Sequence, residues 1–556
     1  MKQLLLSLSF LFITNIIFTQ SDFSISTLEN TRNKAIINLP YPIIFVHGLT
    51  GGHTTWGTLK ETWTNRGFIF GGRLSYHLDY DDNIGFCDFD RDVQEFNRPI
   101  EKGDFYIVNF NTDLDGNDLG EGIFSFINRT NSNQAAIVKQ GYALQQMVQK
   151  VLAITQREKV ILIGHSMGGL AIREYLQNPN LWASNSSHHV AKYVSVGTPH
   201  NGSNFSGSGL GELVGLDEES DAVRDLRRSY DWTGEAGVFL FGGLENDDVI
   251  DNGFFSTYHN LDVNCDGRIA TFVDGLNNEY VPNDLEYACV IGSVLGSNNS
   301  DGVVGSTSAN LNYVSGFASR QIEAFQISGL FSANTSHSKL TDNILYLFRS
   351  LDEPDNYEHS YDIIFGEQYA GYMTKQGAGS YILDYDDYRF EFDGNGMIEV
   401  GIINAAHRDF TVSIISEDGE TLFMEFKPDY RAVSFSPKIN LPSGKYILEL
   451  RASILETDEE IPYSFLLNRT NISVSTNEIF DSSLKVFPNP TDRYLQIRSE
   501  QEKLVFYRII DVLGRNIQSG LLTDNQIDLN SLPNQKYIVQ LFNEEGLFIS
   551  RLIFKG

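Results

Sequence analysis

Basic residues are few in this sequence relative to acidic ones, and the imbalance narrows the range of partners. Lys and Arg together number 41, whereas Asp and Glu number 72 in a chain of 556 residues, for a formal net charge of −31. A surface with this excess of negative charge repels phosphate backbones and anionic membranes. We therefore expect no nucleic-acid partner, and an acidic surface whose ordinary role is solubility.

Cysteine is also scarce. The chain has only Cys87, Cys265 and Cys289, so at least one thiol stays unpaired. None of the three has the spacing of a metal-binding motif. One disulfide and three buried thiols are both compatible with the sequence.

Long apolar runs are missing beyond the N-terminus. No later stretch reaches the roughly 20 apolar residues of a membrane-spanning helix, so we expect no transmembrane span. Residues 1–20 begin with Met-Lys and continue with a short apolar stretch, a pattern typical of a secretory signal peptide. The remaining chain is expected to be soluble and exported.

At 556 residues the chain is too long for one core and suggests about three to four domains. Changes of pattern divide it, after the signal peptide, into residues 21–352, 353–470 and 477–556. In the first segment, short apolar strands at residues 43–48 and 105–110 precede a helical pattern at 134–157. This alternation of strands and helices favours a mostly parallel sheet covered by helices on both faces.

Residues 159–176 contain the most informative motif. An apolar, β-branched strand at 160–163 leads into Gly-His-Ser-Met-Gly, and helical spacing begins just past Met167. A serine on so tight a turn between strand and helix is forced outward, and a Cβ at the flanking positions would collide with both elements. This is the arrangement of a nucleophile elbow, with Ser166 as the nucleophile. A plain glycine-rich loop is the alternative interpretation.

Three motifs on successive strands together resemble those of lipases and related esterases. They are His-Gly-x-x-Gly-Gly at 47–52, Gly-His-Ser-Met-Gly-Gly at 164–169 and Gly-Thr-Pro-His-Asn-Gly-Ser at 197–203. The nearest branches are the triacylglycerol-lipase-like and GPI inositol-deacylase-like α/β-hydrolases, over about residues 38–350. The resemblance implies an α/β-hydrolase fold with an oxyanion hole formed by the backbone N–H groups of Leu49 and Met167.

The fold also requires an acid and a base after the nucleophile, in the order Ser, Asp or Glu, His. His337 follows the strand expected near 322–327, where this fold places its base. Asp301 lies in an Asp-Gly-Val-Val segment after the strand at 287–292, and lipases of this type carry a similar segment there. The triad predicted is therefore Ser166, Asp301 and His337, with His259 as the reserve base and Asp274 and Asp284 as reserve acids.

Residues 204–285 have no counterpart in a minimal α/β-hydrolase domain. We expect this insertion to form a cap or lid over the site rather than a plain loop region. Within them, Asp262, Asn264 and Asp266 precede a glycine, as in the opening of an EF-hand Ca²⁺ loop. The acidic residue expected at loop position 12 is missing. The segment is therefore either a structural Ca²⁺ site or an Asp-rich turn. The expected ester hydrolysis itself requires no cofactor.

The last two segments lack helical patterns. Alternating strands separated by Gly, Asp, Asn and Pro turns predict an all-β sandwich at 353–470. Its Leu-Pro-Ser-Gly-Lys-Tyr segment at 441–446 resembles a hairpin of prepeptidase C-terminal-type sandwiches. This module is a spacer, or it binds carbohydrate or protein.

Residues 477–556 resemble the C-terminal sorting domain of type IX secretion substrates. The resemblance rests on Pro-Asn-Pro at 488–490 and Asp-Val-Leu-Gly-Arg at 511–515. It implies the type IX secretion machinery as a partner and a secreted or cell-surface location. Without this resemblance, the sequence of the segment predicts only a small immunoglobulin-like β module.

These observations lead to one functional expectation and its alternatives. We expect a secreted serine hydrolase that cleaves carboxylic esters, with lipids favoured because the motifs resemble lipases. A lipid-anchor deacylase, a thioesterase or an amidase would use the same residues. An alternative of another class is a surface adhesin or carbohydrate-binding protein with an inactive hydrolase fold.

Overall fold

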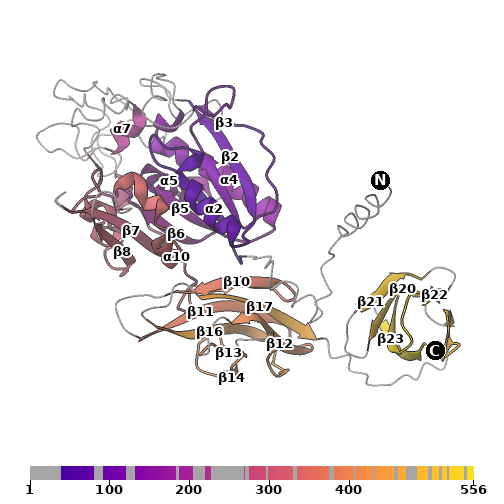
Figure 1. Ribbon diagram of the computed structural model, residues 1–556. Coiled ribbons are helices and arrows are strands. Elements are labelled where there is room, and N and C mark those ends of the chain that lie inside the picture. The colour runs from indigo at the N-terminus through magenta and orange to yellow at the C-terminus, as the bar shows by residue number, and fades with distance from the viewer. Residues whose placement is uncertain are drawn as a thin grey trace, which may run out of the picture.

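The computed structural model places an α/β domain beside a β-sandwich and a second, smaller β module (Figure 1). The described residues are 39–79, 92–119, 132–182, 187–203, 220–226, 268, 274–295, 299–329, 335–374, 381–405, 409–429, 433–455, 461–470, 485–498, 504–511, 516–522, 525–543 and 548–555. The expected signal peptide at residues 1–20 and most of the expected cap at 204–285 lie outside them.

The α/β domain is built on an eight-stranded sheet of order β3-β2-β4-β1-β5-β6-β7-β8. Only the pairing of β2 with β3 is antiparallel, and the other neighbours run parallel. The strands are β1 Ile43–Val46, β2 Phe70–Leu78, β3 Val93–Glu95, β4 Phe105–Asn109, β5 Val160–His165, β6 Val190–Val196, β7 Glu286–Val294 and β8 Glu323–Gly329.

Helices cover both faces of this sheet, as the alternating pattern predicted. On β1, the Ile43 and Phe45 side chains pack with those of α2 and α10, whereas Ile44 and Val46 pack on the side of α4 and α5. Successive strand residues point to opposite faces, so a run of consecutive apolar residues buries both sides. The helices are α2 Gly57–Asn65, α4 Ile137–Thr155, α5 Met167–Gln177, α7 Asp221–Leu226, α9 Ser306–Ala309 and α10 Ile344–Ser350.

Short 3₁₀ turns connect several of these elements. They are η1 His53–Trp56, η3 Ser132–Gln134, η4 Pro179–Leu181, η7 Leu276–Asn278, η8 Leu311–Tyr313 and η9 His337–Asp342. Pro179 opens η4 two residues after α5 ends. Since proline cannot continue an α-helix, Pro179 keeps α5 from extending further.

The predicted all-β sandwich is present as two packed sheets. One has the order β10-β17-β12-β15 and the other β14-β13-β16-β11-β9. Their pairings are antiparallel except for that of β9 with β11. The strands are β9 Tyr361–Asp362, β10 Gln368–Met373, β11 Tyr381–Phe392, β12 Met397–Ala405, β13 Thr411–Ser416, β14 Leu422–Phe426, β15 Ser434–Phe435, β16 Gly444–Leu455 and β17 Ile461–Thr470.

The C-terminal module has two further sheets and a core of its own, which includes Leu495, Ile509 and Val539. Its strands are β18 Lys485–Phe487, β19 Tyr494–Arg498, β20 Leu504–Asp511, β21 Asn516–Leu521, β22 Gln526–Asp528, β23 Lys536–Asn543 and β24 Phe548–Phe554. The predicted fold class, an α/β-hydrolase sheet followed by all-β modules, is thereby confirmed.

The α/β domain and the sandwich share one hydrophobic core. Trp63 of α2 lies 5.4 Å from Phe348 of α10 between ring centroids, and Phe348 lies 5.0 Å from Tyr372 of β10. The Arg66 guanidinium stands 4.3 Å above the Phe348 ring. Figure 1 shows β10 against this side of the α/β domain. Burial of apolar side chains therefore joins the two domains. The change of sequence pattern near residue 352 marked the domain boundary but did not indicate this shared core.

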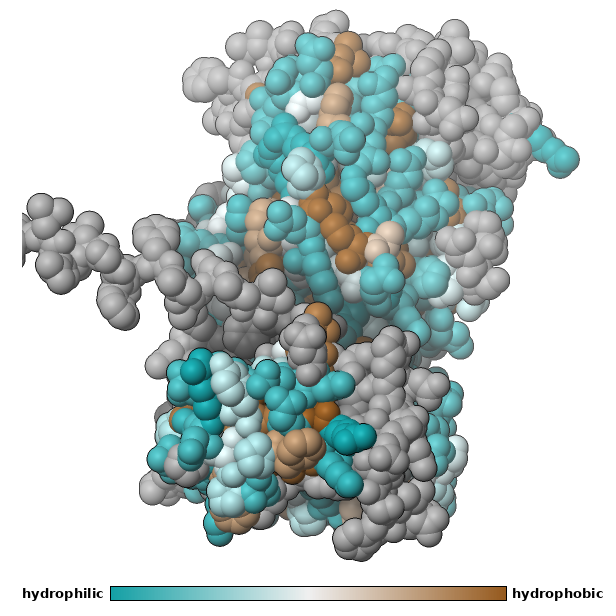
Figure 2. Space-filling model, turned by 90° about the vertical axis from the view of Figure 1, so that its right-hand side faces the viewer, coloured by the Kyte–Doolittle hydropathy of each residue, from teal (hydrophilic) through white to brown (hydrophobic). Residues whose placement is uncertain are grey.

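The described surface is mostly hydrophilic on the face in Figure 2, with small apolar patches between polar residues. In the described part of the chain, no helix is long and apolar enough to cross a membrane. Cys289 is a free, buried thiol in β7, and Cys87 and Cys265 lie outside the described residues.

Candidate active site

Ser166 occupies a strained turn between β5 and α5. Its backbone has φ 54° and ψ −128°, a region that residues with a Cβ rarely adopt. Its N–H donates to the carbonyl of Val196 on β6 at 2.9 Å. A Cβ on Gly164 would lie 2.5 Å from the Gly169 nitrogen, and one on Gly168 would collide with the His47 carbonyl oxygen. The two glycines allow the close approach that holds the serine outward, as the motif predicted.

The structure brings Ser166, His337 and Asp301 together from three separate segments. The Nε2 atom of His337 lies 2.8 Å from the Ser166 Oγ, and its Nδ1 lies 2.7 Å from the Asp301 Oδ2. The backbone N–H of His337 also donates to the Asp301 carbonyl at 3.0 Å. His337 opens η9 after β8, and Asp301 lies in the turn after β7. This chain of hydrogen bonds is the geometry of a nucleophile, a base and an orienting acid.

The environment of Asp301 keeps its carboxylate ionised. The side chain is buried, which by itself raises the pKa, but the neighbouring His337 and the N–H groups of Val303 and Val304 favour the charged form. These N–H groups donate to Oδ1 at 2.9 and 2.7 Å. The net effect holds the pKa of Asp301 below its usual value. Because Oδ1 is occupied in this way, Oδ2 faces His337.

The turn that carries Leu49 lies beside Ser166 and the start of α5, where Met167 is found. Met167 is the first residue of α5, so its N–H belongs to the first helical turn, where amide groups lack an intrahelical acceptor. Leu49 follows β1 in the turn after Gly48, and a Cβ on Gly48 would collide with the Ser166 side chain. The Leu49 side chain packs against the apolar cluster that contains Met167, so the two predicted oxyanion residues border the same cluster.

His47 fixes the loop that carries Leu49. Its Nδ1 lies 2.9 Å from the Gly48 carbonyl, and its Nε2 lies 2.9 Å from the backbone N–H of Phe110. Since Nε2 has to accept, the proton sits on Nδ1 and the ring is neutral. Burial agrees with this tautomer, because it lowers the pKa of His47 to about 4.

His165 is a site residue that sequence reasoning passed over. Its Nε2 lies 2.9 Å from the carbonyl oxygen of His337, and the two rings are 4.9 Å apart between centroids. The Trp56 ring lies edge-on to the His165 ring, with 6.4 Å between the ring centroids. Burial lowers the pKa of His165 to about 3, so the ring is a neutral donor. The available signal was its position in the Gly-His-Ser motif, directly before the nucleophile.

The reserve acids have partners away from the triad, and the reserve base lies outside the described residues. Asp284 binds His188, with 2.9 Å between Oδ1 and Nε2. Asp274 lies close enough to Glu279 to help raise its pKa to about 8, after the larger effects of burial and of Glu174. His259 lies outside the described residues, as do the three predicted metal ligands Asp262, Asn264 and Asp266.

An apolar cluster borders the oxyanion loops. Met167 and Leu170 of α5 pack with Ala222 and Leu226 of α7, the helix in the described part of the expected cap, and Leu49 packs against this group. Ile137 and Leu276 complete the cluster. These side chains are buried, so the cluster packs α5 and α7 together beside the oxyanion loops.

Two segments of the chain match known protein families. Residues 40–212 match the model described as a PGAP1-like alpha/beta domain, and residues 485–555 match the secretion system C-terminal sorting domain. The chain therefore carries a PGAP1-like α/β-hydrolase domain and a type IX secretion sorting domain. The sorting domain implies a secreted or cell-surface protein. No curated protein sequence matches the chain.

Solved structures of low identity also resemble parts of the chain. The product of the gene lin2722 from Listeria innocua is 17% identical over 57% of this chain and 95% of its own, with a TM-score of 0.32. The Bacillus licheniformis lipase BlEst2 in propeptide form is 14% identical over 94% of both chains, with a TM-score of 0.29. The pre-peptidase C-terminal domain of the Bacillus anthracis collagenase is 14% identical over 21% of this chain and 99% of its own, with a TM-score of 0.16. At such low scores these similarities have no bearing on activity.

Proposed function

We propose that this protein is a secreted serine hydrolase that cleaves carboxylic esters through Ser166, His337 and Asp301. The observation that carries the proposal is the continuous hydrogen-bond chain from Ser166 Oγ through His337 to Asp301 Oδ2, with distances of 2.8 and 2.7 Å. A signal peptide at residues 1–20 and the sorting domain would direct its export.

The proposed reaction begins with proton transfer from Ser166 to His337 Nε2 as the Oγ attacks the ester carbonyl. Asp301 holds the imidazole in the correct tautomer and stabilises the imidazolium. The N–H groups of Leu49 and Met167 would bind the oxyanion, each worth roughly 3 kcal/mol of transition-state stabilisation. His337 then protonates the leaving alcohol, and water hydrolyses the acyl-enzyme by the reverse sequence.

The resemblance of the three strand-end motifs to those of lipases supports an ester with an apolar acyl chain. The match to a PGAP1-like domain is a reason to keep a lipid-anchor deacylase among the candidates. A thioesterase or an amidase would use the same triad. The β-sandwich at 353–470 is proposed as a spacer that packs against the catalytic domain.

A chain-length series tests the proposal. Wild type and Ser166→Ala are compared on p-nitrophenyl esters from acetate to stearate, with an emulsified lipid included. We expect wild type to prefer longer chains and Ser166→Ala to lose roughly 10⁴-fold or more in kcat. A preference for short soluble esters would indicate an esterase rather than a lipase. A wild-type chain inactive on every ester would favour the adhesin alternative.

A further inference from the structure

The base of the proposed triad is the first residue of a short 3₁₀ turn, and hydrogen bonds join its backbone to two neighbouring segments. The N–H of His337 donates to the carbonyl of Asp301 at 3.0 Å. The carbonyl of His337 lies 2.9 Å from Nε2 of His165. The first bond ties the base to the acid, and the second ties it to β5, the strand that ends directly before Ser166. His165 thus reaches the base from the element that presents the serine.

His165 is itself held by its surroundings. It is the last residue of β5 and lies opposite Val196 in the parallel pairing of β5 with β6. Its side chain is buried, and the Trp56 ring lies edge-on to the imidazole. Because a strand inside a sheet places its side chains more precisely than a loop does, His165 is a fixed point beside the segment that carries His337.

The rings of the two histidines also lie side by side. Their centroids are 4.9 Å apart and their planes are inclined at 41°. A carbonyl oxygen can only accept, so Nε2 of His165 carries the proton that it donates to His337. Burial, followed by the neighbouring His337, lowers the pKa of His165 to about 3. The ring beside the base is therefore neutral at neutral pH, and no like charge opposes an imidazolium on His337.

We propose that His165 is a positioning residue for the catalytic base, and that its hydrogen bond to the His337 carbonyl keeps Nε2 of His337 within reach of the Ser166 Oγ. This role rests on the proposed serine-hydrolase function. The hydrogen bond of His165 is to the backbone of the base and not to a reacting atom, so His165 acts through His337. A displacement of about 1 Å at a catalytic group can cost on the order of 10²-fold in rate, which sets the size of the expected effect.

Three substitutions separate the hydrogen bond from the ring contact. His165→Gln keeps an N–H donor at a similar reach but removes the ring, whereas His165→Phe keeps an aromatic ring but removes the donor. His165→Asn carries the amide on a side chain one methylene shorter, so its N–H falls short of the carbonyl. Because donor and shape change separately, a general loss of packing does not give the order of rates predicted for the hydrogen bond.

Full-length wild type and the three variants are compared on one p-nitrophenyl ester, with kcat and KM measured separately. We expect His165→Phe and His165→Asn to lower kcat roughly 10- to 100-fold and to change KM less than about twofold, because the base moves while the contacts to substrate remain. His165→Gln should keep kcat within about threefold of the wild-type value, since the donor is retained.

Proton NMR of the resting proteins gives a readout that does not depend on turnover. The proton in the 2.7 Å hydrogen bond between Nδ1 of His337 and Oδ2 of Asp301 should resonate at low field in wild type, because the bond is short and charge-assisted. This signal should shift or broaden in His165→Phe and His165→Asn as the base moves. It should persist in His165→Gln.

His188→Phe is the matched control for these variants. His188 is also buried, but its Nε2 pairs with Asp284 and it lies before β6, at the end of the sheet away from the triad. The control should keep the wild-type kcat and the low-field signal. Thermal unfolding shows which variants are folded, and where His165→Phe fails to fold, His165→Asn decides.

Two results would overturn this role of His165. In one, His165→Phe and His165→Asn keep the wild-type kcat and the low-field signal. In the other, His165→Gln is as slow as they are, so the hydrogen bond does not matter. Both leave the proposed function standing when wild type hydrolyses the ester and Ser166→Ala does not. A wild type inactive on every ester would contradict the proposed function instead, and the low-field signal would still decide whether His165 holds the base.

Discussion

Asp301 acts on the serine only through His337, and its charge can be removed with little change in shape. Asp301→Asn should lower kcat by on the order of 10³- to 10⁴-fold, because the amide favours the wrong imidazole tautomer. Initial rates on a p-nitrophenyl ester measure this loss, with circular dichroism as the check on folding. Asp284→Asn is the control, since Asp284 binds the distant His188 and should leave kcat unchanged. Equal losses in the two variants would contradict the assignment of the acid.

The buried imidazole of His165 should make the free energy of unfolding depend on pH. Its folded-state pKa of about 3 lies below the ordinary value of 6.5, so the unfolded chain binds more protons between these values. The contribution of His165 is therefore complete above pH 6.5 and is lost as pH falls towards 3, by about 1.4 kcal/mol per pH unit. His165→Gln keeps a donor for the His337 carbonyl but cannot titrate.

Urea unfolding of wild type and His165→Gln at several pH values between 4 and 7 isolates this effect. The difference in unfolding free energy between the two proteins should shrink steadily as pH falls. A constant difference would mean that His165 titrates normally in the folded protein. The comparison cancels other buried groups, such as Glu353, whose pKa burial raises to about 7.

At the scale of elements, the turn between β5 and α5 depends on glycine. Gly164→Ala places a Cβ 2.5 Å from the Gly169 nitrogen, which is backbone and cannot move aside like a flexible side chain. We expect this substitution to cost about 1–3 kcal/mol of stability and to displace Ser166. Thermal unfolding and ester hydrolysis measure the two effects.

Gly57→Ala is the matched control for this prediction. Gly57 begins α2 with helical backbone angles, and nothing lies within 4 Å of a Cβ built there. Because alanine favours the helix over glycine, the control should be neutral or stabilising by up to about 1 kcal/mol. A Gly164→Ala variant as stable and active as this control would contradict the tight packing of the elbow.

The sequence predicted best those elements that carry a local motif. The elbow at Ser166 and the turn of Asp301 each have a recognisable motif, and the order of acid and base along the chain pointed to His337. By contrast, Asp352 and Asp386 are 34 residues apart and meet only because β11 packs against the segment after α10. Long-range packing of this kind leaves no local periodicity, so neither this carboxylate pair nor the shared core was predictable.

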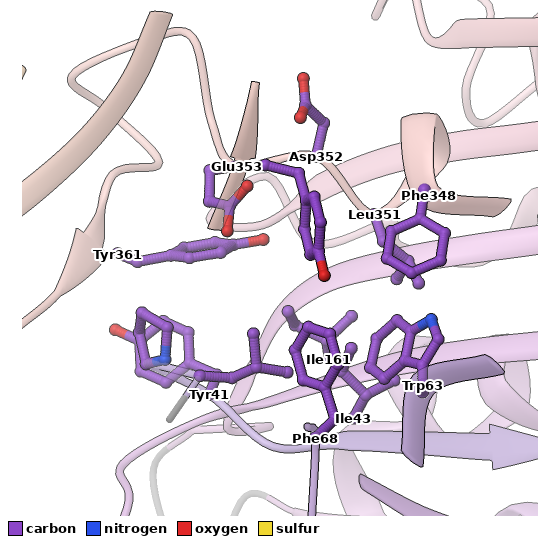
Figure 3. Close-up of a pocket in the computed structure, with 13 residues that line it drawn as sticks. Tyr41, Ile43, Trp63, Phe68, Ile161, Phe348, Leu351, Asp352, Glu353 and Tyr361 are labelled. Atoms are coloured by element: carbon purple, nitrogen blue, oxygen red, sulfur yellow. The ribbon is translucent and has the colours of Figure 1, made fainter. Parts of the chain in front are cut away.

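At the scale of the whole molecule, the C-terminal module has its own core, whereas the sandwich shares one, seen in part in Figure 3, with the hydrolase domain. Deletion of residues 485–556 should therefore leave both kcat/KM and the main unfolding transition unchanged. Tyr372→Ala, at the junction, should lower stability by about 3 kcal/mol through lost aromatic packing. Scanning calorimetry and ester hydrolysis of both variants test this. A deletion that abolished activity would show that the module takes part in the catalytic unit.

The proposed acyl-enzyme is the central claim, and mass spectrometry tests it most directly. Wild type is mixed with a p-nitrophenyl ester, quenched in acid within the first turnover and digested. The peptide containing Ser166 should carry the mass of the acyl group, and the same peptide from His337→Ala should not. An unmodified Ser166 peptide during active turnover, or ester hydrolysis by Ser166→Ala at the wild-type rate, would contradict the mechanism.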